Sequence, residues 1–243
     1  LRVLDKFLDN DGKRGKSFLV FGSTASPETP NLNQFMEEWG IGVEDGMAFE
    51  TNSNYRYQDA VLMWGQDNDL IGDESTSELL CFSANNVALK QAYEENNSRT
   101  SHILMTTSPY AVLAPKGTKP GYTPPSSAKE SEMPLVMVTE DTTYDDDYDE
   151  VTSYVGYFAS ADLVSETWYD YGSVGNMEYA VTVVNAISGR DSSKMYFLPK
   201  ITGTTSMTVS DSQQMTVRIV CMIVLPLVVL IGGILIWILR RVR

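Results

Sequence analysis

The segment Ser17–Gly40, SFLVFGSTASPETPNLNQFMEEWG, joins the pattern of a strand directly to the pattern of a helix. Residues 17–22 form an apolar run bounded by polar turns, which is typical of a buried β-strand. In the second half, Asn31 is placed to cap a helix and Gly40 to end it. The segment therefore predicts a strand followed by an amphipathic helix. The apolar stripe of that helix comprises Leu32, Phe35, Met36 and Trp39.

Similar patterns flank this segment on both sides. Residues 1–8 carry an apolar stripe at helical spacing, and residues 47–49 have the pattern of a short strand. The order helix, strand, helix, strand predicts an α/β fold with a doubly wound, mainly parallel sheet. Because Leu1 is not an initiator methionine and already belongs to the first stripe, we expect the chain to be truncated at its N-terminus.

Further elements follow at irregular intervals. Asn176 is placed to cap a second helix that ends at Gly189. Two segments have loop composition: the proline-rich residues 116–133 predict a flexible excursion, and the acidic residues 140–150 a solvated or disordered loop. The predicted apolar face of the second helix comprises Met177, Ala180, Val181, Val184 and Ile187. Short strands are predicted at Leu79–Phe82, Ile103–Thr106, Leu135–Thr139, Tyr154–Phe158 and Met195–Leu198.

An uncharged stretch near the C-terminus predicts a membrane span. Ile219–Leu239 contains no charged residue, and a helix of that length crosses roughly 30 Å, the thickness of a bilayer's hydrocarbon core. Three arginines follow this stretch, whereas only Arg218 directly precedes it, so the positive-inside rule places the tail in the cytoplasm. We therefore expect an outer domain (1–200), a neck (201–217), a transmembrane helix (218–239) and a basic cytoplasmic tail (240–243).

The charge and cysteine content limit the class of protein and its partners. The chain carries 18 Lys and Arg against 32 Asp and Glu, a formal net charge of −14. Such an acidic surface repels nucleic acid and favours cationic or neutral partners, although it also serves solubility. Cys221 falls in the predicted span and leaves Cys81 alone outside it, so no disulfide can form within the outer domain. That domain must be held together by its core.

The sequence motifs for catalysis are incomplete. Residues 10–17, NDGKRGKS, end like a phosphate-binding loop, but they lack its first glycine and precede a strand, so a turn is expected. Cys81 and His102 could pair as nucleophile and base, but a mid-strand cysteine is more typical of a structural residue. No G-x-S-x-G elbow occurs, and a single histidine excludes a multi-histidine metal site. We therefore expect no enzymatic activity and no cofactor.

Two acidic stretches resemble calcium ligands in part. Asp67, Asp69 and Glu78 match positions of a calcium-binding loop. Ile71, however, occupies a position of that loop where a side-chain oxygen is needed. Residues 145–150 carry a run of carboxylates without a fixed turn. Both stretches are weak calcium candidates.

Small polar residues gather where predicted strands end and where a predicted helix begins. In a doubly wound sheet, ligands bind at that edge. The same residue types also cap strand-to-helix turns, and both interpretations stay open. The candidate ligand-binding residues are Ser23, Thr24, Thr106, Thr107, Ser108, Ser160, Asp162 and Asn176.

Several segments, taken in order, resemble one protein family. They cover most of the chain, and they resemble the GldG-type auxiliary component of an ABC-2 type transport system. The segments are Phe18–Phe21, Pro30–Gly46 (PNLNQFMEEWGIGVEDG), Ile103–Ser108 (ILMTTS), Pro134–Glu140, Val155–Asp162 and Gly175–Arg190 (GNMEYAVTVVNAISGR). The last segment is the apolar run that begins with Leu225, Pro226 and Leu227 and stops at Arg240 and Arg241.

This resemblance implies an outer domain related to the glutamine amidotransferase-like and flavodoxin-like folds, without that enzyme's catalytic machinery. It also implies a bacterial plasma membrane, with ABC permease and ATPase subunits as partners. We therefore predict a non-enzymatic, membrane-anchored accessory subunit of an ABC-type exporter, whose outer domain docks the permease or the transported material. The alternatives are a membrane-tethered cell-surface hydrolase or amidase, and a glycan- or peptide-binding module.

Overall fold

The computed structural model describes residues 2–66, 68–71, 79–119, 121–145, 147–170 and 174–189, and a few isolated residues between 215 and 241. The chain divides into two compact units, Leu1–Tyr196 and Phe197–Arg243. The helices and strands described below all belong to the first unit.

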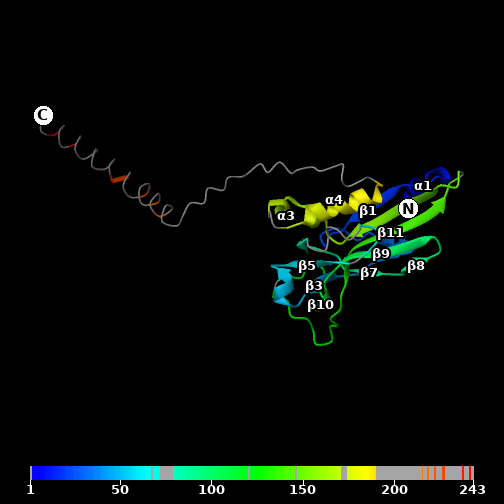
Figure 1. The fold of residues 1–243 in the computed structure, drawn as a ribbon. Helices are drawn as coiled ribbons and strands as arrows, with labels where there is room; N and C mark the ends of the chain where they lie inside the picture. Colours follow the sequence, from blue (N-terminus) through cyan, green and yellow to red (C-terminus); the bar gives the residue numbers. More distant parts are fainter. Residues whose placement is uncertain are drawn as a thin grey trace. The chain divides into compact units, whose positions relative to one another are not determined.

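The main sheet is mixed and mostly antiparallel (Figure 1). Its strands follow the order β1-β12-β11-β9-β5-β4, with β6 paired to β5 and β8 paired to β9. The strands are β1 (Ser17–Phe21), β4 (Arg56–Tyr57), β5 (Ala60–Gly65), β6 (Cys81–Ser83), β8 (Glu95–Asn96), β9 (Arg99–Thr106), β11 (Pro134–Tyr144) and β12 (Glu150–Phe158). Two small antiparallel pairs accompany the sheet, namely β2 (Ile41–Val43) with β7 (Leu89–Gln91) and β3 (Met47–Glu50) with β10 (Ala111–Ala114).

The prediction of a doubly wound, mainly parallel sheet is wrong. Among the strand pairs of the described residues, only β1 and β12 run parallel. The physical reason lies in the connections, because antiparallel strands can be joined by a short turn, whereas parallel neighbours need a crossover of a dozen or more residues. Strands β11 and β12 show this directly, since they form one long hairpin through residues 145–149.

The acidic segment 140–150 is therefore not the solvated or disordered loop that its composition predicts. Residues 140–144 belong to β11 and Glu150 begins β12. Between them, the Asp145 carboxylate accepts hydrogen bonds from the backbone N–H groups of Asp147 and Asp149, both at 2.9 Å. Tyr148 takes a left-handed backbone conformation with a φ of 63°. Backbone pairing continues across the turn, because the Asp145 N–H donates to the Asp149 carbonyl at 2.9 Å. The side-chain hydrogen bonds of Asp145 add to this pairing, as in an Asx turn.

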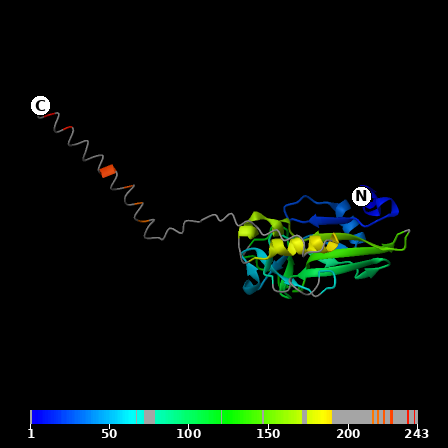
Figure 2. The same cartoon turned by 45° about the horizontal axis from the view of Figure 1, so that its top comes forward.

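Helices cover both faces of the sheet (Figures 1 and 2). The Phe18 ring packs edge-on against Phe35 of α2, with 6.3 Å between the ring centroids. The neighbouring Ser17 hydroxyl donates to the Ile187 carbonyl of α4 at 2.9 Å. Successive residues of a strand point to opposite faces, so α2 and α4 lie on opposite sides of β1. The helices are α1 (Arg2–Asp9), α2 (Pro30–Glu38), α3 (Glu166–Asp170) and α4 (Asn176–Ile187), and the 3-10 turns are η1 (Asn10–Gly12), η2 (Ser53–Tyr55) and η3 (Ala161–Val164).

The main core lies between these helices and the sheet. Its fully buried side chains include Met36, Ile41, Leu104, Met137, Phe158 and Tyr179. A smaller cluster forms around Phe49 and Val112 on the β3–β10 pair. Within the proline-rich segment, Tyr122 packs edge-on against Phe49 at 5.4 Å, and the Ser131 N–H donates to the Ala111 carbonyl at 2.8 Å. These contacts attach the segment to the smaller cluster.

The buried face of α4 differs from the predicted one. Tyr179, Ala180, Val183 and Ile187 are buried, whereas Met177, Val181 and Val184 are exposed. The prediction placed three exposed residues in the apolar face because α4 is apolar on more than one side. Its large buried residue, Tyr179, carries a hydroxyl and was left out of the stripe.

The predicted membrane span has no counterpart among the described residues. No helix within them is both long and apolar enough to cross a bilayer. The predicted neck (201–217), transmembrane helix (218–239) and last strand (195–198) fall almost wholly outside the part of the chain that the structure describes.

Candidate functional site

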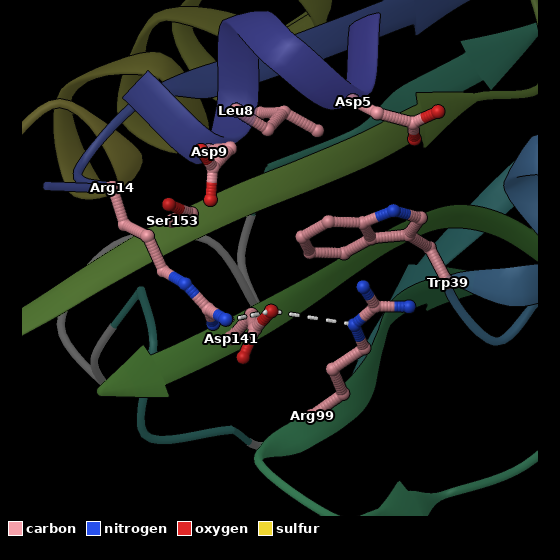
Figure 3. A pocket seen from close by; sticks show the side chains of 8 residues that line it. All are labelled: Asp5, Leu8, Asp9, Arg14, Trp39, Arg99, Asp141 and Ser153. Carbon is pink, nitrogen blue, oxygen red and sulfur yellow. Dashed lines mark hydrogen bonds and ion pairs between the residues drawn. The ribbon is translucent and has the colours of Figure 1, made fainter. Parts of the chain in front are cut away.

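A pocket of about 150 Å³ lies beside helix α1 and the end of α2, over strands β9, β11 and β12 (Figure 3). Charged side chains dominate it. Its lining residues are Asp5, Leu8, Asp9, Arg14, Trp39, Arg99, Asp141 and Ser153.

Asp141 is the buried centre of this pocket. Its side chain is 7% exposed, and its Oδ2 atom lies 3.0 Å from Arg14 Nη1 and 3.4 Å from Arg99 Nε. Figure 3 shows the two guanidinium groups on opposite sides of the carboxylate. The Ser98 hydroxyl donates to Oδ1 at 2.6 Å. Strand register explains the position of Asp141, because it lies between Arg99 of β9 and Ser153 of β12.

Arg99 is fixed by three separate contacts. Besides its pair with Asp141, its guanidinium carbon lies 4.0 Å from the centre of the Trp39 ring, which is a cation–π contact. Its Nη1 donates to the Glu38 carbonyl at 2.8 Å. The Tyr93 hydroxyl donates to the same carbonyl at 2.9 Å, and partial burial raises the pKa of Tyr93. The end of α2 is thus tied to β9.

Arg14 reaches Asp141 from the turn before β1. Arg14 has a φ of 50° and Gly15 a φ of 72°, so the backbone turns through the left-handed region twice in succession. The Gly15 N–H donates to the Ser153 hydroxyl at 3.0 Å, which attaches the turn to β12. A substituent at Gly15 would also meet Val151 at 3.1 Å. Residues 10–16 are therefore a turn that precedes a strand, as the sequence predicts, and not a phosphate-binding loop.

The charged side chains of the pocket pair mainly with one another. Arginine side chains stay protonated, so Arg14 and Arg99 act as hydrogen-bond donors and not as acid–base groups, and both guanidinium groups pair with Asp141. The exposed carboxylates Asp5 and Asp9 lie on α1. Within the described ranges, no group of three or more His, Cys, Asp or Glu side chains is arranged to hold a metal ion.

The candidate residues at the ends of β1 and β12 come together, because these two strands are parallel and end side by side. The Thr24 N–H donates to the Asn85 carbonyl at 2.9 Å. The Asn85 side-chain amide donates to Asp162 Oδ2 at 2.5 Å. The Ser160 hydroxyl donates to the Ala84 carbonyl, and Ser23 accepts from the Ala25 N–H at 3.1 Å. All four candidates take part in turn contacts around residues 84–85 and 23–25.

The candidate residues at the end of β9 form a second group. The Thr106 hydroxyl donates to Glu132 Oε1, and the Ser108 hydroxyl to the buried Glu50 carboxylate, both at 2.5 Å. Thr107 accepts a hydrogen bond from the Met133 N–H at 3.0 Å. These three side chains join β9 to its neighbours, and their role in ligand binding stays a prediction.

Asn176 holds strand β6 against α4. Its side-chain oxygen accepts from the Phe82 N–H at 2.8 Å, and its amide nitrogen donates to the Phe82 carbonyl at 2.7 Å. The side chain is 1% exposed. Asn176 is the first residue of α4 and follows its cap, Gly175. The Asn176 side chain therefore pairs with the N–H and carbonyl of Phe82 as the backbone of a neighbouring strand would.

Cys81 and His102 have separate environments. Cys81 lies buried on β6 opposite Met63 of β5, and burial, assisted by Glu178, raises the pKa of its thiol to about 12. A thiol with that pKa stays protonated near neutrality, whereas the nucleophile in cysteine chemistry is the thiolate. His102 lies on β9, and its Nε2 is 3.2 Å from Glu140 Oε1 on β11.

The calcium candidates are only partly described. Asp67 and Glu78 fall outside the described residues, and Asp69 is an exposed turn residue. The Asn68 carboxamide oxygen accepts from the N–H groups of Leu70 and Ile71, both at 3.1 Å. The acidic tract 145–150 contains the hairpin turn that Asp145 closes. Calcium binding at either place stays a prediction.

The residues at the centre of the pocket were not among the predicted site residues. One signal was present: Met137, Thr139 and Asp141 alternate on β11 and are all buried. The Thr139 hydroxyl donates to the Trp39 carbonyl at 2.5 Å, on the face that carries Asp141. Val136 and Val138 are buried as well, so the same period leads to Glu140 from the other face, and the sequence alone does not single out Asp141 as the buried carboxylate.

Comparison with known proteins yields a likeness in fold. The chain matches no family model and no curated protein. A solved structure described as the mmIFT52 N-terminal domain is similar, with 15% sequence identity and a TM-score of 0.50. The similarity covers 77% of this chain and 69% of that chain. At this identity the likeness concerns the fold alone, and it agrees with the mixed, mostly antiparallel sheet.

Proposed function

We propose that this chain is a non-enzymatic, membrane-anchored accessory subunit of an ABC-type exporter, with an outer domain that docks the permease or the transported material. The observation that carries the proposal is the ordered set of sequence segments resembling the GldG-type auxiliary component, which spans the chain from Phe18 to Arg241. In this proposal, the ATPase subunit supplies the chemical energy and the outer domain supplies a binding surface.

The contacts of the polar residues support a binding role. Ser108, Ser160 and Asn176 use their side chains to join strands and turns. The charged groups of the pocket pair with one another around Asp141. Such contacts give a rigid domain, and rigidity lowers the entropy cost of docking.

The alternative of a cell-surface hydrolase or amidase requires a nucleophile with a base in hydrogen-bonding reach. Cys81 is buried with a raised pKa, and His102 lies beside Glu140 on other strands. The alternative of a glycan- or peptide-binding module is favoured by a different observation, the exposed aromatic side chains around Trp64.

Co-purification tests the proposal. The full chain is extracted from its native membrane in a mild detergent with an affinity tag, and co-purified proteins are identified by mass spectrometry. We expect a multi-span permease and an ATPase in stoichiometric amounts. A control chain that lacks residues 218–243 should lose them if the predicted span is the anchor. Recovery of the intact chain alone, under conditions that keep other membrane complexes together, would contradict the proposal.

A further inference from the structure

Three aromatic side chains form a partly exposed stack, which we call the aromatic stack: Tyr55, Trp64 and Tyr110. The Tyr55 ring lies 5.6 Å from Trp64 in an edge-on arrangement and 6.0 Å from Tyr110 in a stacked one. Trp64 is 43% exposed and Tyr110 45% exposed. These residues come from η2, β5 and the segment between β9 and β10. Large aromatic side chains this exposed are typical of binding surfaces.

Hydrogen bonds hold the backbone beneath the stack. Trp64 lies opposite Thr106 in the pairing of β5 with β9. The Thr51 hydroxyl donates to the Tyr110 carbonyl at 2.8 Å. The Tyr110 N–H donates to the Ser108 hydroxyl at 3.1 Å, and that hydroxyl in turn donates to buried Glu50. The aromatic rings are therefore presented by a fixed backbone.

Two exposed glutamates border the aromatic stack. Glu132 Oε1 accepts from the Thr106 hydroxyl and, at 3.2 Å, from the Gln66 amide. Gln66 follows Trp64 by two residues, directly after β5 ends at Gly65. Glu130 Oε1 lies 3.4 Å from the Thr51 hydroxyl that also reaches the Tyr110 carbonyl. Within the described residues, the hydrogen bonds that Glu130 and Glu132 accept involve only the Oε1 atom of each side chain.

The pocket described above already contains a contact of the kind that this arrangement would make with a cation. In the pocket, the Arg99 guanidinium lies 4.0 Å over the Trp39 ring and pairs with the Asp141 carboxylate. The aromatic stack with Glu130 and Glu132 offers the same two kinds of group, a partly exposed tryptophan ring and a carboxylate. Arg56, which is near this region in sequence, is instead placed over Phe49 at 5.6 Å.

We propose that the aromatic stack, together with Glu130 and Glu132, is a docking surface for an arginine- or lysine-bearing segment of a partner protein. A cation attracts the face of an aromatic ring, and a carboxylate beside the ring adds an ion pair. The formal net charge of −14 steers a basic segment toward the molecule. A saccharide is a poorer fit, because the nearby Gln66 amide already donates to Thr106 and Glu132.

This inference deepens the proposed function by naming a docking face and the chemistry of its partner. It rests on the proposed function only for the identity of that partner. Direct binding of a basic peptide does not require a permease, so the two ideas can fail separately. Loss of co-purification with retained peptide binding would contradict the exporter role alone.

The test is a titration of a fluorescein-labelled hexa-arginine peptide with the full chain in mild detergent, followed by fluorescence anisotropy at low salt. Trp64→Leu keeps an apolar side chain and removes the aromatic face. We expect it to weaken binding about two- to fivefold, the range for cation–π contacts at exposed sites. Glu130→Gln and Glu132→Gln should each weaken binding and reduce its dependence on salt.

A matched control is Tyr148→Leu, at the tip of the β11–β12 hairpin. Tyr148 is 87% exposed and lies between Asp147 and Asp149. The hairpin tip thus combines an exposed aromatic ring with neighbouring carboxylates, and it is remote in sequence from the stack. It should leave the affinity unchanged. Circular dichroism checks that each variant is folded, and Trp64→Phe gives a second variant with an aromatic face, which should bind more tightly than Trp64→Leu.

Three outcomes would overturn the inference. The first is equal affinity of folded Trp64→Leu and the parent chain for hexa-arginine. The second is an equal loss with Tyr148→Leu, which would assign the binding to the acidic hairpin tip. The third is Trp64-dependent binding of an uncharged hexaglutamine peptide or an oligosaccharide with no binding of hexa-arginine.

Discussion

Replacing Asp141 by asparagine removes one negative charge from the pocket while keeping the size of the side chain. Two guanidinium groups, from Arg14 and Arg99, would then face each other across a neutral amide. The amide can still accept a hydrogen bond from Ser98, but its nitrogen would meet donors on the arginine side. We expect Asp141→Asn to destabilise the fold at the junction of α1, α2, β9 and β11.

The magnitude follows from the burial of the three partners. Breaking a buried ion pair by removing one member costs about 3–5 kcal/mol. Arg14 and Arg99 are 35% and 31% exposed, so water recovers part of their solvation once the carboxylate is gone. We therefore expect a loss of about 2–4 kcal/mol in the free energy of unfolding.

Urea unfolding of the full chain in mild detergent, followed by far-ultraviolet circular dichroism, measures this loss. The matched control is Glu44→Gln, which removes a carboxylate from an exposed ion pair with Lys90 at 2.8 Å. That change should cost less than about 1 kcal/mol. Arg14→Gln and Arg99→Gln, alone and together, complete a cycle that measures how strongly the two arginines are coupled through Asp141. An Asp141→Asn variant within the error of the Glu44→Gln control would refute the idea that this carboxylate organises the pocket.

Three further substitutions test single contacts. Cys81 should resist iodoacetamide at pH 8 until the protein unfolds. The pKa of its thiol is about 12 in the folded state and about 8.5 in the unfolded chain, so the thiol contributes stability below pH 8.5 that is lost as the pH rises toward 12. Cys81→Ala should therefore make the urea midpoint fall less steeply over this pH range. Asn176→Ala leaves the Phe82 N–H and carbonyl without their partner and should cost about 1–3 kcal/mol by urea unfolding. Gly156→Ala places a methyl group 2.5 Å from Leu19 and should cost about 1–3 kcal/mol by urea unfolding. Gly121→Ala meets open space instead, so any cost there comes from the backbone φ of +94°.

Local patterns predicted several elements well because their cause is local. The apolar run of β1 and the stripe of α2 lie where the sequence places them, at Ser17–Phe21 and Pro30–Glu38. Their signals, an apolar period and a bounding glycine or proline, are complete within a few residues. The helix cap was less accurate, since Thr29 rather than Asn31 precedes the first turn.

The second half of β11 was missed because its stability comes from distant residues. Glu140, Asp141, Thr142 and Thr143 have the composition of a loop, and only their partners make them a strand. Asp141 is compensated by Arg14 and Arg99, which lie on other elements of the fold. A buried charge is tolerated only when it is paired. The partners of Asp141 lie more than forty residues away in the sequence, at Arg14 and Arg99, so the residues next to Asp141 do not reveal the pairing.

Strand direction was the other limit. The sequence order of helices and strands suggested parallel neighbours, and β1 with β12 does form such a pair. The candidate residues at those two strand ends accordingly meet around Asn85. The remaining strands pair through hairpins and long-range returns that no local pattern specifies, and β5 was missed altogether. The aromatic stack could not be predicted for the same reason, since its three members come from separate segments.

Strand β9 joins the two surfaces to which we assign separate roles. Arg99 at its start belongs to the pocket, and Thr106 at its end lies opposite Trp64 of the aromatic stack. At about 3.3 Å per residue these positions are roughly 23 Å apart, well beyond the distance at which substitutions usually couple. Asp141→Asn should therefore lower the stability without changing the affinity of the folded protein for hexa-arginine, and Trp64→Leu should lower the affinity with little effect at the pocket. A loss of affinity in folded Asp141→Asn would mean that the ion pairs at one end of β9 set the position of the backbone at the other, and the pocket would then be part of the docking surface rather than only its support.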